Sequence, residues 1–149
     1  MAKKTFKGRV VLAGKVTGKA TVSKHPFNTS GSYMENMFAG RTDAAPCTDA
    51  SNKELFGKDI SRAILCTPTT VGSTMGGMTL MGMKAIGVGP QAMLFSKPID
   101  TLAAAGVLMA DIWKNQRIVT IDMLGDEFLE TVQMGDPIAI HEDGRVEVG

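Results

Sequence analysis

The stretch that decides the fold is residues 66–80, Cys66-Thr-Pro-Thr-Thr-Val-Gly-Ser-Thr-Met-Gly-Gly-Met-Thr-Leu80. The apolar run 63–66 leads into it and predicts a buried strand, which Pro68 then prevents from continuing simply as strand or helix. Apolar spacing resumes at Met75 and predicts a helix to about Ala85. Residues 72–74, Gly-Ser-Thr, are therefore expected in a strand-to-helix turn. Free N–H groups and the helix dipole there favour an anion or a developing negative charge.

Two interpretations of this turn remain open on spacing alone. Ser73 or Thr74 can simply cap the helix, because Ser and Thr are preferred N-caps. Against this, Gly76 and Gly77 fall in the first turns of the predicted helix, where each Gly costs roughly 0.5–1 kcal/mol relative to Ala. The glycine pair predicts that a ligand or another backbone approaches very closely.

Length and composition restrict the class of protein. The 149 residues predict a single domain, residues 1–149, large enough to bury its own core. Hydrophobic residues make up 44% of the chain and the net charge is +1, so neither nucleic acid nor an acidic partner is implied. The N-terminal sequence Met-Ala-Lys-Lys lacks a signal-peptide core, and no run reaches membrane-spanning length. We therefore expect a cytoplasmic protein with no membrane association.

No metal site is predicted within this chain. Cys47 and Cys66 form no CxxC pair, and His25 and His141 are distant from both in sequence. Structural zinc and iron–sulfur sites usually need three or four ligands at close spacing. Both cysteines are expected to be small buried or loop thiols.

The rest of the chain predicts short strands and a few helices in one mixed α/β domain. Residues 25–52 are polar without sustained periodicity and predict a long irregular loop, of the kind that forms lids or binding loops. Its apolar side chains either pack on their own domain or meet a partner. Strands are predicted at residues 8–14 and 18–23 around a Gly-Lys turn, at 91–95 and 117–121, and in a hairpin at 137–140 and 145–148. Helices are predicted at residues 99–105, followed by a separate apolar run at 107–110, and at 126–132.

Four sequence features together indicate a family. They are Gly8…Gly14…Gly18-Lys-Ala, the turn Pro68…Gly72-Ser73-Thr74, Gly89-Pro90 before a strand, and Gly135-Asp136 before the last hairpin. In these features the chain resembles, over nearly its whole length, the small swivelling domain of aconitase X. The resemblance implies a β/β/α swivelling domain like the mobile domain of ordinary aconitases, with a central helix starting near Ser73. It also implies a separate small subunit rather than a fused domain.

The resemblance further implies the chemistry. Members are hydro-lyases whose large subunit carries an iron–sulfur cluster, so we expect a large-subunit partner and no cofactor bound by this chain. The expected substrate is a small hydroxy acid, first cis-3-hydroxy-L-proline, with phosphomevalonate as the alternative. Ser73 matches the family's proposed catalytic base, and Gly72, Thr74 and Thr70 are expected to bind substrate. Thr69-Thr70-Val71 and Gly76-Gly77 depart from the usual motif, which bears on substrate identity.

A serine can act as a base near neutral pH only if its surroundings lower the pKa of its hydroxyl. A serine hydroxyl loses its proton only far above neutral pH, near the pKa of water, so lowering its pKa to neutrality costs roughly 12 kcal/mol at 1.36 kcal/mol per pKa unit. A helix N-terminus supplies at most about 2 kcal/mol. No Arg, Lys or His lies beside Ser73 in sequence, so a second chain is expected to supply the remainder. The alternative from another class is a non-catalytic ligand-binding or swivelling module, in which Ser73 is only a helix cap.

Overall fold

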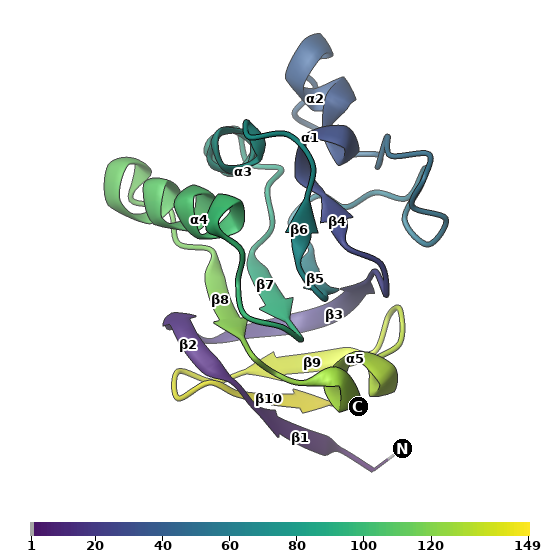
Figure 1. Ribbon diagram of the computed structural model, residues 1–149, viewed down its shortest axis with the longest axis vertical. Helices are drawn as coiled ribbons and strands as arrows, with labels where there is room; N and C mark the ends of the chain where they lie inside the picture. The colour runs from purple at the N-terminus through teal and green to yellow at the C-terminus, as the bar shows by residue number, and fades with distance from the viewer. Residues whose placement is uncertain (1) are drawn as a thin grey trace.

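Eight strands form one bent sheet in the structure, a computed structural model that describes residues 2–149 (Figure 1). Their order is β1-β10-β9-β3-β5-β7-β8-β2. The four central strands β3, β5, β7 and β8 run parallel, and the strands on both sides of them pair antiparallel. Their bounds are β1 Lys4–Lys7, β2 Arg9–Leu12, β3 Val16–Val22, β5 Ile64–Thr67, β7 Ala92–Phe95, β8 Val119–Asp122, β9 Pro137–Ile140 and β10 Arg145–Val148.

The central parallel strands are short and apolar because both of their faces are covered. Every residue of β5, β7 and β8 is buried. Strands covered on both faces carry continuous apolar runs rather than an alternating pattern. This confirms the buried strands predicted from the runs at 63–66 and 91–95, and it places the strand predicted at 117–121 at Val119–Asp122.

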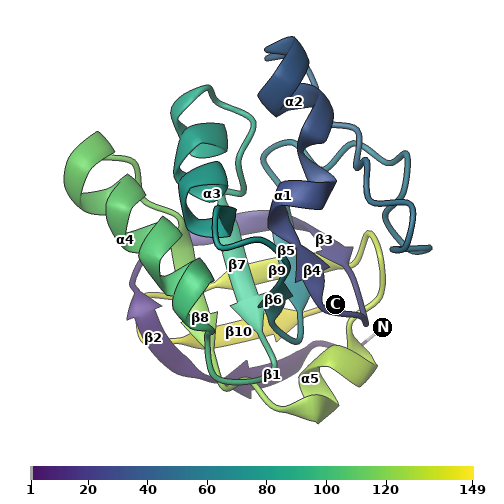
Figure 2. The same ribbon diagram turned by 45° about the horizontal axis from the view of Figure 1, so that its top comes forward.

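The strand β3 bends the sheet into two layers. Its first half, from Val16 to Lys19, pairs with β9, and its second half, from Ala20 to Val22, pairs with β5. The layer β1-β10-β9 therefore folds across the parallel strands (Figure 2). One apolar core fills the space between the two layers. The short helix α5 (Asp126–Thr131) contributes Phe128 to this core, where its ring meets Phe6 edge-on at 5.4 Å between centroids. The predicted helix at 126–132 is confirmed.

A layer of helices covers the other face of the parallel strands. The helices α3 (Gly76–Ala85) and α4 (Thr101–Lys114) lie side by side there, and the second apolar core lies beneath them. The arrangement is a three-layer β/β/α domain, which confirms the predicted fold class. Among residues 2–149, no helix is long and apolar enough to cross a membrane.

The predicted division of α4 was wrong. The sequence indicated a helix at 99–105 and a separate apolar run at 107–110, with Gly106 between them, whereas the chain forms one helix of 14 residues. Ala103, Val107 and Ala110 follow helical spacing and are all buried. Gly106 does not break the helix. It lies where the backbone of α3 packs against α4, and a Cβ on Gly106 would lie 2.8 Å from the Gly77 carbonyl oxygen.

The predicted turn between residues 14 and 18 does not make a hairpin. The strand β2 pairs with β8 and the strand β3 pairs with β9 and β5, so the two neighbours in sequence never pair with each other. The strand β1, which precedes them, was not predicted. Its Phe6 is buried between exposed neighbours, and such alternation over only four residues is a weak signal.

The segment 25–52 is less irregular than predicted. It contains a short strand β4 (Phe27–Asn28) and the helices α1 (Thr29–Ser32) and α2 (Met34–Ala39). Phe27 and Tyr33 are fully buried against each other and the domain core, so much of its apolar content packs on its own domain. Phe38, by contrast, is 78% exposed.

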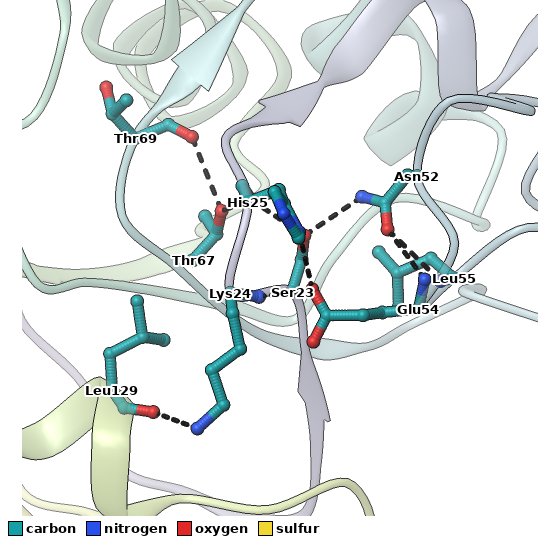
Figure 3. Close-up of polar contacts among 9 residues, drawn as sticks. All are labelled: Ser23, Lys24, His25, Asn52, Glu54, Leu55, Thr67, Thr69 and Leu129. Atoms are coloured by element: carbon teal, nitrogen blue, oxygen red, sulfur yellow. Dashed lines mark hydrogen bonds and ion pairs between the residues drawn. The ribbon is translucent and has the colours of Figure 1, made fainter.

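Polar contacts fix both ends of this segment to the sheet (Figure 3). The Ser23 hydroxyl donates to the His25 carbonyl at 2.7 Å, and the Thr67 hydroxyl donates to the same carbonyl at 3.0 Å. The Asn52 amide donates to the Ser23 hydroxyl at 2.9 Å, which ties the end of the segment to its beginning. The His25 ring nitrogen Nδ1 also lies 3.1 Å from the Glu54 carboxylate oxygen Oε1.

Candidate active site

The site is built on the connection between β5 and α3. Pro68 ends β5, and the chain then forms a two-residue strand, β6 (Thr70–Val71), which pairs in parallel with β4. The Phe27 N–H donates to the Thr69 carbonyl at 2.9 Å at the start of this pairing. The strand-to-helix turn expected from the sequence is therefore preceded by a small second sheet, β4-β6, which the sequence did not indicate.

The Asp100 carboxylate anchors β6 from the other side. One of its oxygens caps α4 by accepting from the Leu102 and Ala103 N–H groups at 3.1 and 3.0 Å. The other accepts from the Thr69 hydroxyl at 3.1 Å, the Thr70 N–H at 2.9 Å and the Thr70 hydroxyl at 2.6 Å. One side chain thus holds the start of α4 against the strand that leads into the predicted site.

The hydrogen bonds to Asp100 also set its protonation. Partial burial works to raise the pKa of the Asp100 carboxyl, but the bonds donated by Thr70, Ala103 and Thr69 outweigh it and hold that pKa below its ordinary value. The carboxylate is therefore charged near neutral pH. Thr70, predicted to bind substrate, is buried with its hydroxyl directed to this carboxylate.

Gly72 is required by its conformation and by its neighbour. Its φ is +108°, a value that side-chain-bearing residues rarely adopt. A Cβ on Gly72 would also lie 2.5 Å from the Asn28 side-chain oxygen, which accepts from the Gly31 N–H at 2.9 Å to cap α1. The chain therefore turns after β6 at a position that only Gly can occupy.

Ser73 follows this reversal and is exposed to solvent. Its hydroxyl oxygen accepts from the Met75 N–H at 3.1 Å, and its carbonyl accepts from the Gly76 N–H at 2.9 Å. The helix itself begins at Gly76, and no side chain caps it. Ser73 therefore stabilises a local turn before the helix rather than the helix N-terminus, and the interpretation of Ser73 as a helix N-cap was wrong. Thr74 lies beside it, also exposed.

A neighbouring backbone explains the second glycine of the pair, Gly77, but not the first, Gly76. A Cβ on Gly77 would lie 2.8 Å from the Leu102 carbonyl oxygen, and one on Gly106 would lie 2.8 Å from the Gly77 carbonyl oxygen. The two helices thus touch backbone to backbone, as the predicted close approach required. A Cβ on Gly76 would have no neighbour closer than 3.9 Å.

Apolar side chains next to Ser73 in the chain are exposed to solvent. Val71, Met75 and Met78 are 44%, 51% and 60% exposed, so the start of α3 leaves apolar surface open near Ser73. Within residues 2–149, no Arg, Lys or His side chain forms a hydrogen bond with Ser73.

The two cysteines do not fit a metal or an iron–sulfur cluster. Cys47 and Cys66 are both buried, in different apolar cores, and burial raises the pKa of the Cys66 thiol, which disfavours the thiolate that binds metal. No group of three or more potential ligands occurs in the part of the chain that the structure describes.

Sequence reasoning missed two residues of the site, Asn28 and Asp100. Asp100 directly precedes the apolar pattern of α4, so its capping role was readable from the sequence. Its contact with Thr70 was not, because 30 residues separate them. Asn28 precedes Thr29 and Ser30 at the start of a helix too short to give a periodic signal.

The comparisons with known proteins identify the family. Residues 5–148 match the family model described as the aconitase X swivel domain. The chain belongs to the aconitase X swivel-domain family. Curated relatives include the phosphomevalonate dehydratase small subunits of Archaeoglobus fulgidus, 28% identical over 96% of this chain and 97% of the relative, and of Thermococcus gammatolerans, 32% identical over 96% of each.

Solved structures support the same assignment. The holo-form of aconitase X from Thermococcus kodakaraensis matches with a TM-score of 0.80 and 25% identity over 98% of both chains. A UPF0107 protein solved by solution NMR matches with a TM-score of 0.75 and 26% identity over 98% of this chain and 99% of that one. The chain thus belongs with the small subunits of aconitase X-type dehydratases.

Proposed function

We propose that this subunit supplies Ser73 as the general base of a dehydration that is completed at the interface with a large subunit. The observation that carries the proposal is the placement of Ser73, the residue that matches the family motif, on an exposed turn that directly follows Gly72 and the strand bonded to Asp100. In a β-elimination of water, the base takes the proton from the carbon next to the carboxylate. The electron pair of that C–H bond then forms the double bond while the hydroxyl leaves the adjacent carbon.

The residues around Ser73 suit this role. Thr74 and the Gly72 backbone flank it and would contact the substrate, while Thr70 would act on the same site through its bond to Asp100. A cover over Val71, Met75 and Met78 would exclude water from the hydroxyl, and water exclusion strengthens every charge acting on it. We place the family's iron–sulfur cluster in the large subunit, because the described cysteines of this chain do not fit one.

Two hydroxy acids are candidate substrates. The motif resemblance favours cis-3-hydroxy-L-proline, whereas the names of the archaeal relatives favour phosphomevalonate. Both carry a hydroxyl on the carbon next to the one that loses the proton, so either suits the same base. Rates for the two compounds with the reconstituted complex would decide between them.

Substitution of Ser73 tests the proposal directly. In the complex reconstituted with the large subunit, Ser73→Ala should lower the dehydration rate by about 10²–10⁴-fold, the usual contribution of a general base. Stability should fall by no more than about 0.5–1.5 kcal/mol, because the lost bond lies in an exposed turn. Rate per folded complex and thermal unfolding are the two measurements.

Thr74→Ala is the matched control, since it alters the same turn and leaves the Ser73 hydroxyl in place. It should retain most of the rate. A Ser73→Ala complex within about tenfold of the wild-type rate would contradict the catalytic role and support the alternative, a non-catalytic ligand-binding or swivelling module.

A further inference from the structure

The outer face of the helix layer formed by α3 and α4 (Figure 2) lacks the charged side chains that normally cover a solvent-exposed helix. The helix α3 contains one charged residue, Lys84, whose ammonium donates to the Pro90 carbonyl at 3.2 Å. The helix α4 contains Asp111, which pairs with Arg117 at 2.8 Å, and Lys114 at its last position. A helix that is apolar on its outer as well as its inner side is normally covered on both sides.

The exposed side of α4 carries a stripe that is small at the start of the helix and large at its end. Its members follow helical spacing and lie opposite the buried residue Ala103. Leu108 is 43% exposed and Ile112 is 70% exposed. Thr101 and Ala105, which precede them on the same side, are also exposed but short. The second half of this helix therefore projects further from the face than the first half.

The exposed side of α3 shows the reverse order. Met75 and Met78, at the start of the helix, are 51% and 60% exposed, and Gly82 and Ala85 follow them at helical spacing on the same side. Gly82 lies inside the helix, where glycine is less favourable than alanine. A Cβ added to Gly82 would meet nothing within 4 Å. No neighbour within residues 2–149 therefore requires a glycine here, and the space above it is open to a second molecule.

The two stripes share one centre. The stripe on α3 is centred on Leu80, and the stripe on α4 is centred between Gly106 and Val107. These centres are neighbours, because a Cβ added to Gly106 would lie 2.9 Å from the Leu80 side chain. A two-fold axis that crosses both helices at this height would place the large start of α3 over the small end of α3 in a second copy, and the large end of α4 over its small start. Such self-complementarity about one axis suits an isologous dimer.

We propose that the chain forms a two-fold dimer in which the outer faces of α3 and α4 pack on the same faces of a second copy. The helices run antiparallel across the axis, which brings opposite ends of their dipoles together. An axis along the helices would also pair large residues with small ones, but it would place like helix ends together. Each large side chain of one copy lies over a small one of the other. The facing pairs are Met75 with Ala85, Met78 with Gly82, Leu108 with Ala105, and Ile112 with Thr101.

The size of the face fits a dimer that dissociates readily. Its length is set by the 14 residues of α4, which span about 21 Å, and its width by two helices about 10 Å apart. The face therefore measures roughly 20 Å by 20 Å. Interfaces of this extent lie at the lower end of those that are specific, so we expect a dissociation constant on the order of 1–100 μM.

The dimer bears on the Ser73 site, and this step alone rests on the proposed function. Met75 and Met78 are the apolar residues of α3 that a large subunit would cover beside Ser73, and in the dimer the second copy covers them. The large subunit and the second copy therefore compete for the same surface. Self-association would keep this surface out of water in a chain made in excess of its partner.

Sedimentation velocity of the full chain tests the dimer, and dimer should replace monomer as the concentration rises through about 1–100 μM. The fluorescence of Trp113, 73% exposed at the end of α4, gives a second readout and should shift to shorter wavelength. Ile112→Glu buries a carboxylate without a partner, and Gly82→Gln fills the space above α3, so each should weaken dimerisation by about tenfold or more. Phe56→Glu is the matched control, because Phe56 is 55% exposed but lies outside the two helices, and it should leave dimerisation unchanged.

Cysteine cross-linking tests the direction of packing. The native cysteines are buried, so introduced ones report alone. Thr101→Cys and Ile112→Cys chains should cross-link when they are mixed and mildly oxidised. Neither should cross-link with itself, because the two positions lie about 16 Å apart along the helix and a disulfide spans at most about 7 Å between Cα atoms. The linked dimer should bind the large subunit only after reduction.

A chain that stays monomeric at about 1 mM, or a dimer that both Ile112→Glu and Gly82→Gln leave intact, would overturn the proposal. Cross-linking of Thr101→Cys with itself would overturn the antiparallel arrangement. A linked dimer that still binds the large subunit would contradict the competition. Ser73→Ala separates this proposal from the catalytic one, because it should not change dimerisation. An intact dimer with an unchanged rate in that variant contradicts only the role of Ser73.

Discussion

At the scale of single residues, the position of Ser73 depends on a carboxylate that lies 27 residues further along the chain. Asp100 accepts from Thr69, Thr70 and the first turn of α4. A hydrogen bond to a charged group contributes about 1.5–3 kcal/mol, more than a bond between neutral groups. The pair Thr70–Asp100 is therefore a principal restraint on the strand that enters the Ser73 turn.

Removal of the Thr70 hydroxyl should show this restraint. We expect Thr70→Val to lower the free energy of unfolding by about 1.5–3 kcal/mol, because it leaves a buried carboxylate oxygen short of one donor while keeping the side-chain shape. Thr70→Ser keeps the hydroxyl and should cost less. Urea unfolding of the two variants measures the difference, and equal losses would show that the methyl group rather than the hydroxyl matters.

At the scale of elements, the crossing of α3 and α4 fixes where the site helix lies. Gly77 and Gly106 allow the two backbones to touch. Leu80 packs over Gly106, and a Cβ added to Gly106 would lie only 2.9 Å from the Leu80 side chain. Small residues at a helix crossing permit the two helix axes to approach this closely, and larger residues force the helices apart or strain the side chains. The direction in which the first turn of α3 points is set by this contact.

Gly77→Ala should destabilise the domain even though Ala favours helix. The new Cβ would lie 2.8 Å from the Leu102 carbonyl oxygen, which belongs to backbone and cannot easily move. We expect a loss of about 1–3 kcal/mol in thermal unfolding. Gly82→Ala is the control in the same helix, where a Cβ has no neighbour within 4 Å, and it should stabilise by up to about 1 kcal/mol. Equal effects at both positions would contradict a close crossing.

At the scale of the whole molecule, the chain has the cores of an independent domain and an open site. Two apolar cores fill the spaces between its three layers, while the Ser73 turn and the apolar residues around it face solvent. We expect such a domain to fold by itself and to complete the proposed site by docking.

The division of labour between subunits gives a further expectation. Anaerobically purified alone, the chain should fold as a stable domain and bind no stoichiometric iron or zinc, because its cysteines are buried in separate cores. Metal analysis of the isolated chain is the measurement. One equivalent of bound cluster per chain would show that this subunit, rather than its partner, holds the iron.

The local sequence determined the elements that carry their own signal. Continuous apolar runs gave the buried strands β5 and β7, and Pro68 followed by renewed helical spacing gave the turn at Gly72-Ser73-Thr74 and the helix after it. The same stretch, with the glycine and proline positions elsewhere, was enough to indicate the family and to place Ser73 in it. These features depend on contacts within a few residues, so the sequence alone contains them.

The tertiary structure decided everything that depends on distant partners. Gly106 looks like a break in sequence and is a helix contact in space, because only the fold brings Gly77 against it. Residues 27 and 28 become a strand because β6 pairs with them. The bond between Asp100 and Thr70 arises from the sheet order, because β5 and β7 are parallel neighbours that end at the same edge. Parallel strands place residues far apart in sequence at a common edge, and no periodicity along the chain records which of them will meet.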